Sequence, residues 1–164
     1  MSVYVITNAT VLAGVAWTGT APGEPGTQTV SGTITSSVDL TAMLDEVELS
    51  LAADELDFTH MASGGWRIKR PGLKAGTGKL NFHQDFDASQ VDARFGLGGT
   101  FGFASASTLY LDIKPTGASR SATNPSYVLQ FLNLGYQPFG GGVGAKSISP
   151  FSFPTTGLVA RLTS

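Results

Sequence analysis

Residues Leu44–Phe86 read LDEVELSLAADELDFTHMASGGWRIKRPGLKAGTGKLNFHQDF and hold the clearest strand patterns in the chain. In the first run Val47, Leu49 and Leu51 alternate with polar residues, as expected for a strand with one buried face. The alternation slips by one residue at Ala52–Ala53 and then continues on even numbers. A slip of this kind predicts a β-bulge inside the strand.

The second run, Lys79–Phe86, places Leu80, Phe82 and Phe86 on one face. The connection 59–78 between the runs has roughly twenty residues, and structureless loops of that length are uncommon in compact domains. It is also too apolar for a typical disordered linker. We therefore predict an arm that projects from the domain and contacts another molecule. The residues expected at that contact are Met61, Trp66, Arg67, Lys69, Arg70 and Leu73.

Charge divides the same stretch in two. Seven acidic residues and no basic one lie between Asp39 and Asp57, and five basic residues and no acidic one lie between Arg67 and Lys79. Complementary patches of this kind could dock one copy of the chain on the next. The alternative is that both are solvated patches on a monomer.

The composition favours a single domain of 164 residues built from short strands and turns, with 21 glycines and only 13% charged residues. A net charge of −2 argues against a basic nucleic-acid-binding surface. The absence of cysteine excludes disulfides, thiolate chemistry and cysteine-based zinc sites. The N-terminus lacks the pattern of a signal peptide, and no apolar run is long enough to span a membrane.

The rest of the chain predicts an all-β, mainly antiparallel sandwich or barrel with one short flanking α-helix. The helix is expected at Asp87–Gly96, with Asp87 as N-cap and Gln90 completing a capping box. The segment Tyr127–Tyr136 is apolar on both faces, as in a strand that is buried on both sides. A Pro/Gly-rich loop is expected at Gly19–Gln28. Further strands are predicted at Val3–Ile6, Val11–Trp17, Val30–Val38, Thr100–Lys114, Ala145–Phe153 and Gly157–Thr163.

Candidate catalytic, cofactor-binding and metal sites are weak. His60 and His83 show no metal-binding spacing, and we predict that His60 is a loop residue and His83 an outward-facing strand residue. No G-x-S-x-G nucleophile motif occurs, and the glycines at 140–142 fit a turn better than a phosphate loop. We therefore expect no enzyme activity, no cofactor and no metal.

The order of the motifs resembles the major tail tube protein of long-tailed (siphovirus-like) bacteriophages. The similarity covers roughly residues 45–164 and is carried by LDEVELSLAADELDFTHMASGGW, GLKAGTGKLNFHQDF, SQVDARFG, LYLDIKP, SATNPSYVLQFLNLGYQPFGGGVGAKSISPFSFP and TTGLVARLTS. The Gly-rich loop after Asp57, FHQDF followed by a helix, and ATNPSY are the most telling parts. The loop Gly19–Gln28 has no place in the family pattern.

The resemblance implies a structural virion protein, assembled in the host cytoplasm. Six copies would form a ring in which each lends two hairpins to an inner β-barrel, and rings would stack into a hollow tube that conducts DNA to the host. The implied partners are further copies of the chain and the tape-measure, tail-tip and tail-terminator proteins. DNA would pass without specific binding, because an acidic lumen repels phosphates. Glu46 and Glu48 are the expected lumen residues, since they alternate away from the apolar face.

Three alternatives remain open at this point. One is a tail terminator or a contractile-system tube protein of similar fold. A second is a β-sandwich carbohydrate-binding module, for which only Tyr110 and Tyr136 hint at an exposed aromatic face. The third, a small hydrolase, lacks the expected motifs.

Overall fold

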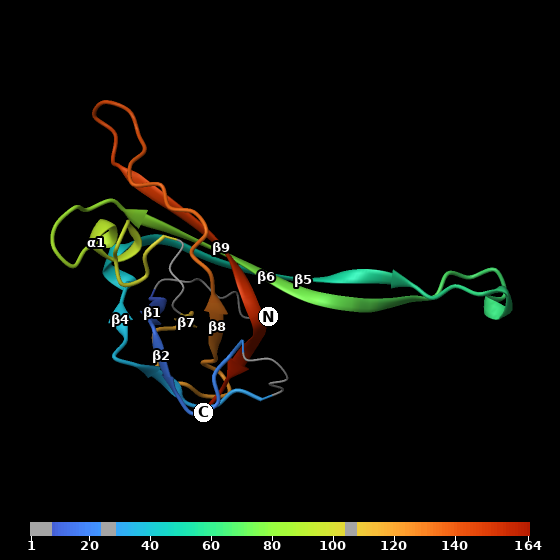
Figure 1. Ribbon diagram of the computed structural model, residues 1–164. Helices are drawn as coiled ribbons and strands as arrows, with labels where there is room; N and C mark the ends of the chain where they lie inside the picture. The colour runs from blue at the N-terminus through green and yellow to red at the C-terminus, as the bar shows by residue number, and fades with distance from the viewer. Residues whose placement is uncertain (1–7, 24–28, 104–107) are drawn as a thin grey trace.

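The computed structural model describes residues 8–23, 29–103 and 108–164 (Figure 1). This part of the chain contains nine strands and one short α-helix, so the prediction of a mainly antiparallel all-β fold with a flanking helix is confirmed. The predicted strand Val3–Ile6 and residues 24–28 of the Pro/Gly-rich loop lie outside the described residues. The elements are β1 Thr10–Gly14, β2 Ala16–Thr18, β3 Thr33–Thr35, β4 Val38–Asp39, β5 Leu44–Asp57, β6 Lys69–His83, α1 Val91–Phe95, β7 Leu109–Lys114, β8 Ser126–Phe131 and β9 Ile148–Leu162, with 3₁₀ turns at Thr41–Met43 and Met61–Ser63.

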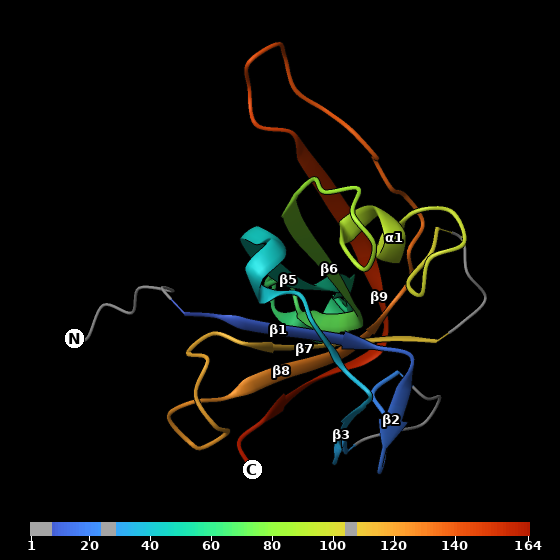
Figure 2. The ribbon, with the colours of Figure 1, turned by 90° about the vertical axis from the view of Figure 1, so that its left-hand side faces the viewer.

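Seven of the strands form one antiparallel sheet in the order β4-β1-β7-β8-β9-β6-β5. The long strand β9 belongs to both halves of this sheet. Its first part, Ile148–Pro154, pairs with β6, and its second part, Thr155–Leu162, pairs with β8. The sheet bends along β9, so that β5 and β6 lie across β1, β7 and β8 (Figure 2). This folding-over creates the two layers around the core.

The core between the layers is built from phenylalanine rings. Phe82 and Phe95 have ring centroids 4.9 Å apart, and Phe95 lies 5.1 Å from Phe151. Phe131 and Phe153 also lie 4.9 Å apart. Tilted contacts of this kind add about 0.5–1.5 kcal/mol each beyond the burial of apolar area. Because Phe95 belongs to α1, these rings fix the helix to the end of the β6–β9 pair.

The opposite face of the sheet is covered by the β2–β3 ribbon. Trp17 on β2 packs against Tyr110 on β7, with ring centroids 5.6 Å apart. The prediction of a strand at Tyr127–Tyr136 that is buried on both sides is confirmed only for its first part. Val128 and Leu129, which point to opposite faces of β8, are both fully buried. The strand ends at Phe131, and Leu132 and Leu134 beyond it are exposed.

Several predicted boundaries are wrong. Val11–Trp17 is two strands that separate at Val15, and Val30–Val38 is interrupted at Ser36, where φ is +54°. Of the strand predicted at Thr100–Lys114, residues 100–103 are not in a strand, residues 104–107 lie outside the described residues, and β7 begins at Leu109. The two predicted C-terminal strands are a single strand, β9, in which Gly157 adopts a φ of +67° and allows the bend.

The helix is shorter than predicted and begins later. It spans Val91–Phe95, with Gln90 as N-cap and no side-chain capping bond, so the predicted Asp87 cap is wrong. Asp87 instead forms a turn, in which its carbonyl oxygen accepts from the Gln90 N–H at 3.1 Å. The structure also exposes Phe86, because the chain leaves β6 at His83 before the predicted alternation ends.

The predicted long loop 59–78 is largely a strand. β6 begins at Lys69, so only residues 58–68 connect it to β5. The sequence shows no strand pattern here because it contains Pro71 and three glycines, Gly72, Gly76 and Gly78, which are uncommon in strands. Pro71 is tolerated because it lies opposite Glu55, next to the bulge, where the other edge of β6 has no strand partner among the described residues.

Candidate functional site

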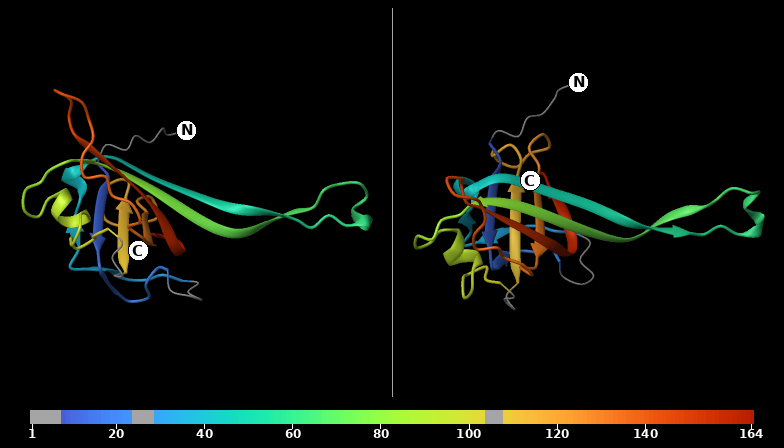
Figure 3. Two further views of the ribbon diagram at one scale, coloured as in Figure 1. Left: turned by 45° about the horizontal axis from the view of Figure 1, so that its top comes forward. Right: turned by 90° about the horizontal axis from the view of Figure 1, so that it is seen from above.

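The outer part of the β5–β6 hairpin projects from the body as an arm, defined here as residues 51–76 (Figure 3). The last residue pair between β6 and β9 is Thr77 with Pro154. Beyond it, β5 and β6 pair only with each other among the described residues, so both outer edges of the arm are open. At about 3.3 Å per residue, β6 from Lys69 to Gly76 spans roughly 25 Å.

A β-bulge interrupts the pairing of the two arm strands. The register shifts between Ala53 and Glu55, where β5 has one intervening residue, Asp54, and β6 has two, Gly72 and Leu73. The extra residue is therefore in β6, and the prediction of a bulge within β5 at Ala52–Ala53 is wrong about the strand that carries it. Because side chains alternate along β5 without interruption, Leu51 lies on the core-side face with Val47 and Leu49, and Leu56 lies on the opposite face, beside Gly72. Both leucines are about half exposed, so the arm exposes apolar side chains on both faces.

The tip of the arm is held by a small set of hydrogen bonds. The carboxylate of Asp57 accepts from the Thr59 N–H at 2.8 Å, and the Thr59 hydroxyl accepts from the Ile68 N–H at 3.0 Å. The Phe58 N–H donates to the Ile68 carbonyl oxygen at 2.8 Å. Hydrogen bonds from Thr59, then the charge of Lys69, lower the pKa of Asp57 below its ordinary 3.8. The tip is thus a closed turn.

The six predicted contact residues all lie on this arm, but they have different surroundings. Trp66 and Leu73 are about 80% exposed, and Met61 is fully exposed in the 3₁₀ turn. Lys69 forms an ion pair with Glu55 at 2.8 Å. Arg70 lies over the ring of Phe58. Arg67 has no ion-pair partner among the described residues.

Phe58 is a candidate contact residue that the sequence analysis missed. The Arg70 guanidinium lies 5.3 Å from the centroid of its ring, within the range of a cation–π contact. The ring is about half exposed. Its spacing of two residues from Leu56 was the signal that could have placed the two side chains on the same face of the arm.

The acidic and basic runs partly neutralise each other within the hairpin. Most of the acidic run lies on β5 and most of the basic run lies on β6, and these two strands are neighbours. Ion pairs therefore form between them, Glu55 with Lys69 and Glu46 with Lys79 at 3.2 Å. The hypothesis that these runs serve contacts between copies therefore applies only to the charges that remain unpaired, chiefly at the tip.

The predicted lumen residues Glu46 and Glu48 lie on the outer face of β5, away from the core. Glu46 also accepts a hydrogen bond from the Asn81 side chain, while Glu48 is exposed and lies opposite Lys79. Glu48 and Lys79 border a shallow groove of about 360 Å³, which reaches across β6 to Ser152 on β9. On this outer face Lys79 pairs with Glu46, and Glu48 has no ion-pair partner among the described residues.

A second charged cluster joins the base of the hairpin, where β5 begins and β6 ends, to the loop before β9. Lys146 lies 2.7 Å from Asp45, and the His83 Nε2 lies 2.8 Å from the same carboxylate. His60, by contrast, lies near the arm tip, so the two histidines are at opposite ends of the hairpin. No group of three or more His, Asp or Glu residues suited to a metal ion occurs within residues 8–23, 29–103 and 108–164.

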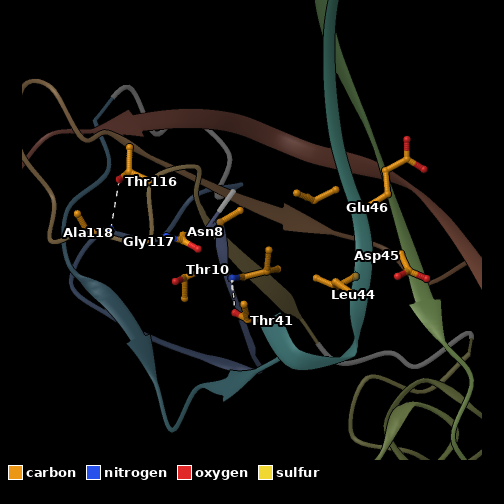
Figure 4. Close-up of a pocket in the computed structure, with 12 residues that line it drawn as sticks. Asn8, Thr10, Thr41, Leu44, Asp45, Glu46, Thr116, Gly117 and Ala118 are labelled. Carbon is orange, nitrogen blue, oxygen red and sulfur yellow. Dashed lines mark hydrogen bonds between the residues drawn. The ribbon is translucent and has the colours of Figure 1, made fainter. Parts of the chain in front are cut away.

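A cavity of about 770 Å³ opens between the start of β1, the start of β5 and the turn after β7 (Figure 4). Its lining includes the hydroxyls of Thr10, Thr41 and Thr116. Thr41 accepts from the Val11 N–H at 3.1 Å. The two carboxylates at the rim, Asp45 and Glu46, are engaged by the lysines described above. Within the described chain, no helix has the length and apolar character needed to cross a membrane.

Comparison with known proteins identifies a shared fold. No family model and no curated protein matches the chain. A solved structure, the virion of a native gene transfer agent (GTA) particle, contains a chain that superposes with a TM-score of 0.50. The match covers 75% of this chain and 86% of that chain, with 14% identical residues. At this identity the likeness shows that the two chains have the same fold.

Proposed function

We propose that this protein is a structural protein of a phage-like virion, and that it forms the tube of a tail. Copies assemble into rings, six to a ring, and the rings stack head to tail into a hollow conduit for DNA. The observation that carries the proposal is the arm, a two-stranded ribbon that extends about 25 Å beyond the body and exposes apolar side chains along its strands and at its tip. Fold likeness to a chain of the gene transfer agent virion supports it.

The physical argument rests on open strand edges and exposed apolar residues. A long two-stranded ribbon with two free edges is a template for pairing with another chain, and soluble monomers normally cover or blunt such edges. An isolated two-stranded hairpin is also only marginally stable in water. Contact with neighbouring copies would cover Leu51, Leu56, Phe58 and Trp66 and would pair the edges at the same time. Self-assembly therefore accounts for features that a free monomer leaves unexplained.

The proposed role is structural rather than enzymatic, and it needs no cofactor. The partners are other copies of the chain, together with tape-measure, tail-tip and tail-terminator proteins of the same particle. DNA would move past the polar outer face of β5 without specific contacts, because Glu46 and Glu48 repel phosphates. The protein would be located in the virion after assembly in the host cytoplasm.

Negative-stain electron microscopy of the purified chain over a concentration series tests this proposal. Hollow tubes or stacked six-fold rings are the expected result. Single rings that do not stack would favour a tail terminator instead. Monomers at every concentration, with an arm that resists limited proteolysis in the free chain, would overturn the proposal.

A further inference from the structure

The end of the molecule opposite the arm carries an apolar patch rimmed by acidic residues, here called the α1 patch. Phe86 and Leu97 flank α1 and are 65% and 91% exposed. The segment that carries Phe86 joins β6 to α1 and Leu97 follows the helix, and Figure 1 shows these segments at the end of the molecule opposite the arm. Large apolar side chains exposed near one another are candidates for a protein contact.

The charge of the α1 patch is negative. Asp85 and Asp87 are exposed on the segment before the helix, and Asp92 is half-buried in its first turn. The basic residue of the helix, Arg94, donates from Nε to the Ser89 carbonyl oxygen. Three carboxylates against one guanidinium favour a partner that is both apolar and basic.

The arm tip has the complementary composition. Phe58 and Trp66 are exposed, Arg67 and Arg70 lie beside them, and no acidic residue occurs between Phe58 and Gly78. Arginine next to an aromatic anchor is the composition commonly found at the energetic centre of protein interfaces. Figure 3 shows the tip far from α1 within one molecule, so the two surfaces can meet only between copies.

Charge distinguishes the α1 patch from a second exposed apolar site. The Gly-rich loop before β9 exposes Phe139 and Val143, which are 71% and 111% exposed. Residues 137–145 include no acidic residue, and the following Lys146 is basic. A basic arm tip gains no electrostatic complement there.

We infer that the arm tip of one copy docks on the α1 patch of a second copy. Trp66 covers Phe86 and Leu97, and the tip arginines face Asp85 and Asp87. This inference rests on the self-assembly in the proposed function and names the surface that receives the arm. Because the two surfaces differ and lie at opposite ends, the contact is heterologous and repeats from copy to copy without closing between two molecules.

Disulfide trapping tests the contact directly, because the chain contains no cysteine. Ala62→Cys places a thiol at the exposed tip, and Ala88→Cys places one in the α1 patch. Mixing the two variants under mild oxidation should give a cross-linked dimer at a yield at least about tenfold above that of the matched control, Ala62→Cys mixed with Val143→Cys. Equal yields, or a higher yield with Val143→Cys, would overturn the inference.

Charge reversal provides a second readout in the same cysteine variants. Arg67→Glu in the tip variant or Asp87→Lys in the patch variant should each lower the yield about tenfold, and the two together should restore it. Microscopy of the wild type keeps the two proposals separate. Tubes without the cross-link would refute this contact and leave the tube standing, whereas the cross-link with open chains but no tubes or rings would refute the tube alone.

Discussion

Arg120 Nη2 lies 2.8 Å from Asp112 Oδ2, and this ion pair is almost entirely enclosed. The side chain of Asp112 is 1% exposed on β7, and that of Arg120 is 14% exposed in the turn that follows. The same guanidinium donates from Nη1 to the Gly32 carbonyl oxygen at 2.9 Å. The pair therefore joins β7, its following turn and the chain before β3.

Replacing Arg120 should be far more damaging than replacing an exposed arginine. Arg120→Ala leaves the Asp112 carboxylate buried without a counter-ion, which typically costs about 3–5 kcal/mol. Arg161→Ala, at an exposed residue that donates to the Ala122 carbonyl oxygen, should cost less than about 1 kcal/mol. Urea denaturation of both variants makes the comparison. An equal loss of unfolding free energy in the two variants would show that the enclosed ion pair stabilises the fold no more than an exposed arginine does.

Gly78→Ala tests how closely β6 and β9 pack. A Cβ at this position would lie 2.1 Å from Cζ of Phe153, so the buried ring or the β6 backbone must shift. Overpacking of this kind costs about 1–3 kcal/mol. The matched control is Gly142→Ala, because no heavy atom lies within 4 Å of the added carbon there and φ is not positive. Thermal melting should separate the two variants, and a melting point for Gly78→Ala equal to that of Gly142→Ala would contradict the packing.

Tyr136 should contribute stability that disappears at alkaline pH. Its hydroxyl donates to Asp92 Oδ1 at 2.9 Å and accepts from Gln84 Nε2 at 3.2 Å. Burial, and to a lesser degree the neighbouring Asp92, raise the pKa of Tyr136 above its ordinary 10.0. A raised folded-state pKa gives stability that is complete below the unfolded-state pKa and is lost as pH rises through the folded-state pKa.

Tyr136→Phe should therefore cost about 0.5–1.5 kcal/mol at neutral pH, through the lost hydrogen bonds. The difference in unfolding free energy between the wild type and Tyr136→Phe should shrink above pH 10. Ionisation of the Tyr136 hydroxyl destabilises the folded wild type there, and the variant has no such hydroxyl. Tyr127→Phe is the control, since its hydroxyl has no hydrogen-bond partner among the described residues. Denaturant curves at neutral and alkaline pH give the measurement, and a gap that stays constant with pH would contradict the assignment.

Trp66→Ala should leave the fold intact and stop assembly. The side chain is 80% exposed at the arm tip, so its removal changes the free energy of unfolding little. Its loss from an interface would remove an aromatic anchor, which commonly costs 2 kcal/mol or more. Sedimentation measures assembly, and circular dichroism checks the fold. Trp66→Phe, which keeps an aromatic ring, should assemble better than Trp66→Ala, and normal tubes from Trp66→Ala would remove the tip from the contact.

Reversal of the outer carboxylates tests the proposed lumen. Glu46→Lys loses an exposed ion pair, worth about 0–1 kcal/mol, and Glu48→Lys places a second cation opposite Lys79. Rings should still form, but DNA ejection from particles that carry both changes should slow. Neutral Glu46→Gln and Glu48→Gln separate loss of repulsion from gain of attraction. Unchanged ejection with both lysines present would place this face outside the lumen.

Alternation along the chain was enough to predict the strands that face the core. Val47 and Leu49 on β5, and Leu80 and Phe82 on β6, lie on the faces that the sequence indicates, whereas the slip at Ala52–Ala53 does not mark the observed bulge, whose extra residue is in β6. These features are local, because side chains alternate across a strand whatever its partners are. The predicted contact residues of the arm were located by the apolar and basic composition of 59–78 and not by alternation, and their role stays a prediction.

The extent of the arm depended on tertiary structure. Pro71 and the glycines between Gly72 and Gly78 gave 59–78 the composition of a loop, yet pairing with β5 makes most of it a strand. The glycines are compatible with β6 because side chains from elsewhere occupy their space: Leu56 lies over Gly72, Thr155 over Gly76 and Phe153 over Gly78. A sequence pattern lists the residues of one segment and gives no information about the neighbours that fill such gaps.

The sequence by itself determined the all-β class, the short helix after β6 and the concentration of exposed aromatic and basic residues between the two longest runs. These follow from periodicity and composition, which act over a few residues. Tertiary structure decided that β9 joins both layers, that Arg120 neutralises Asp112, and that much of the acidic and basic charge is paired within one hairpin. Such contacts join residues far apart in the chain, so they exist only once the sheet has folded over the core.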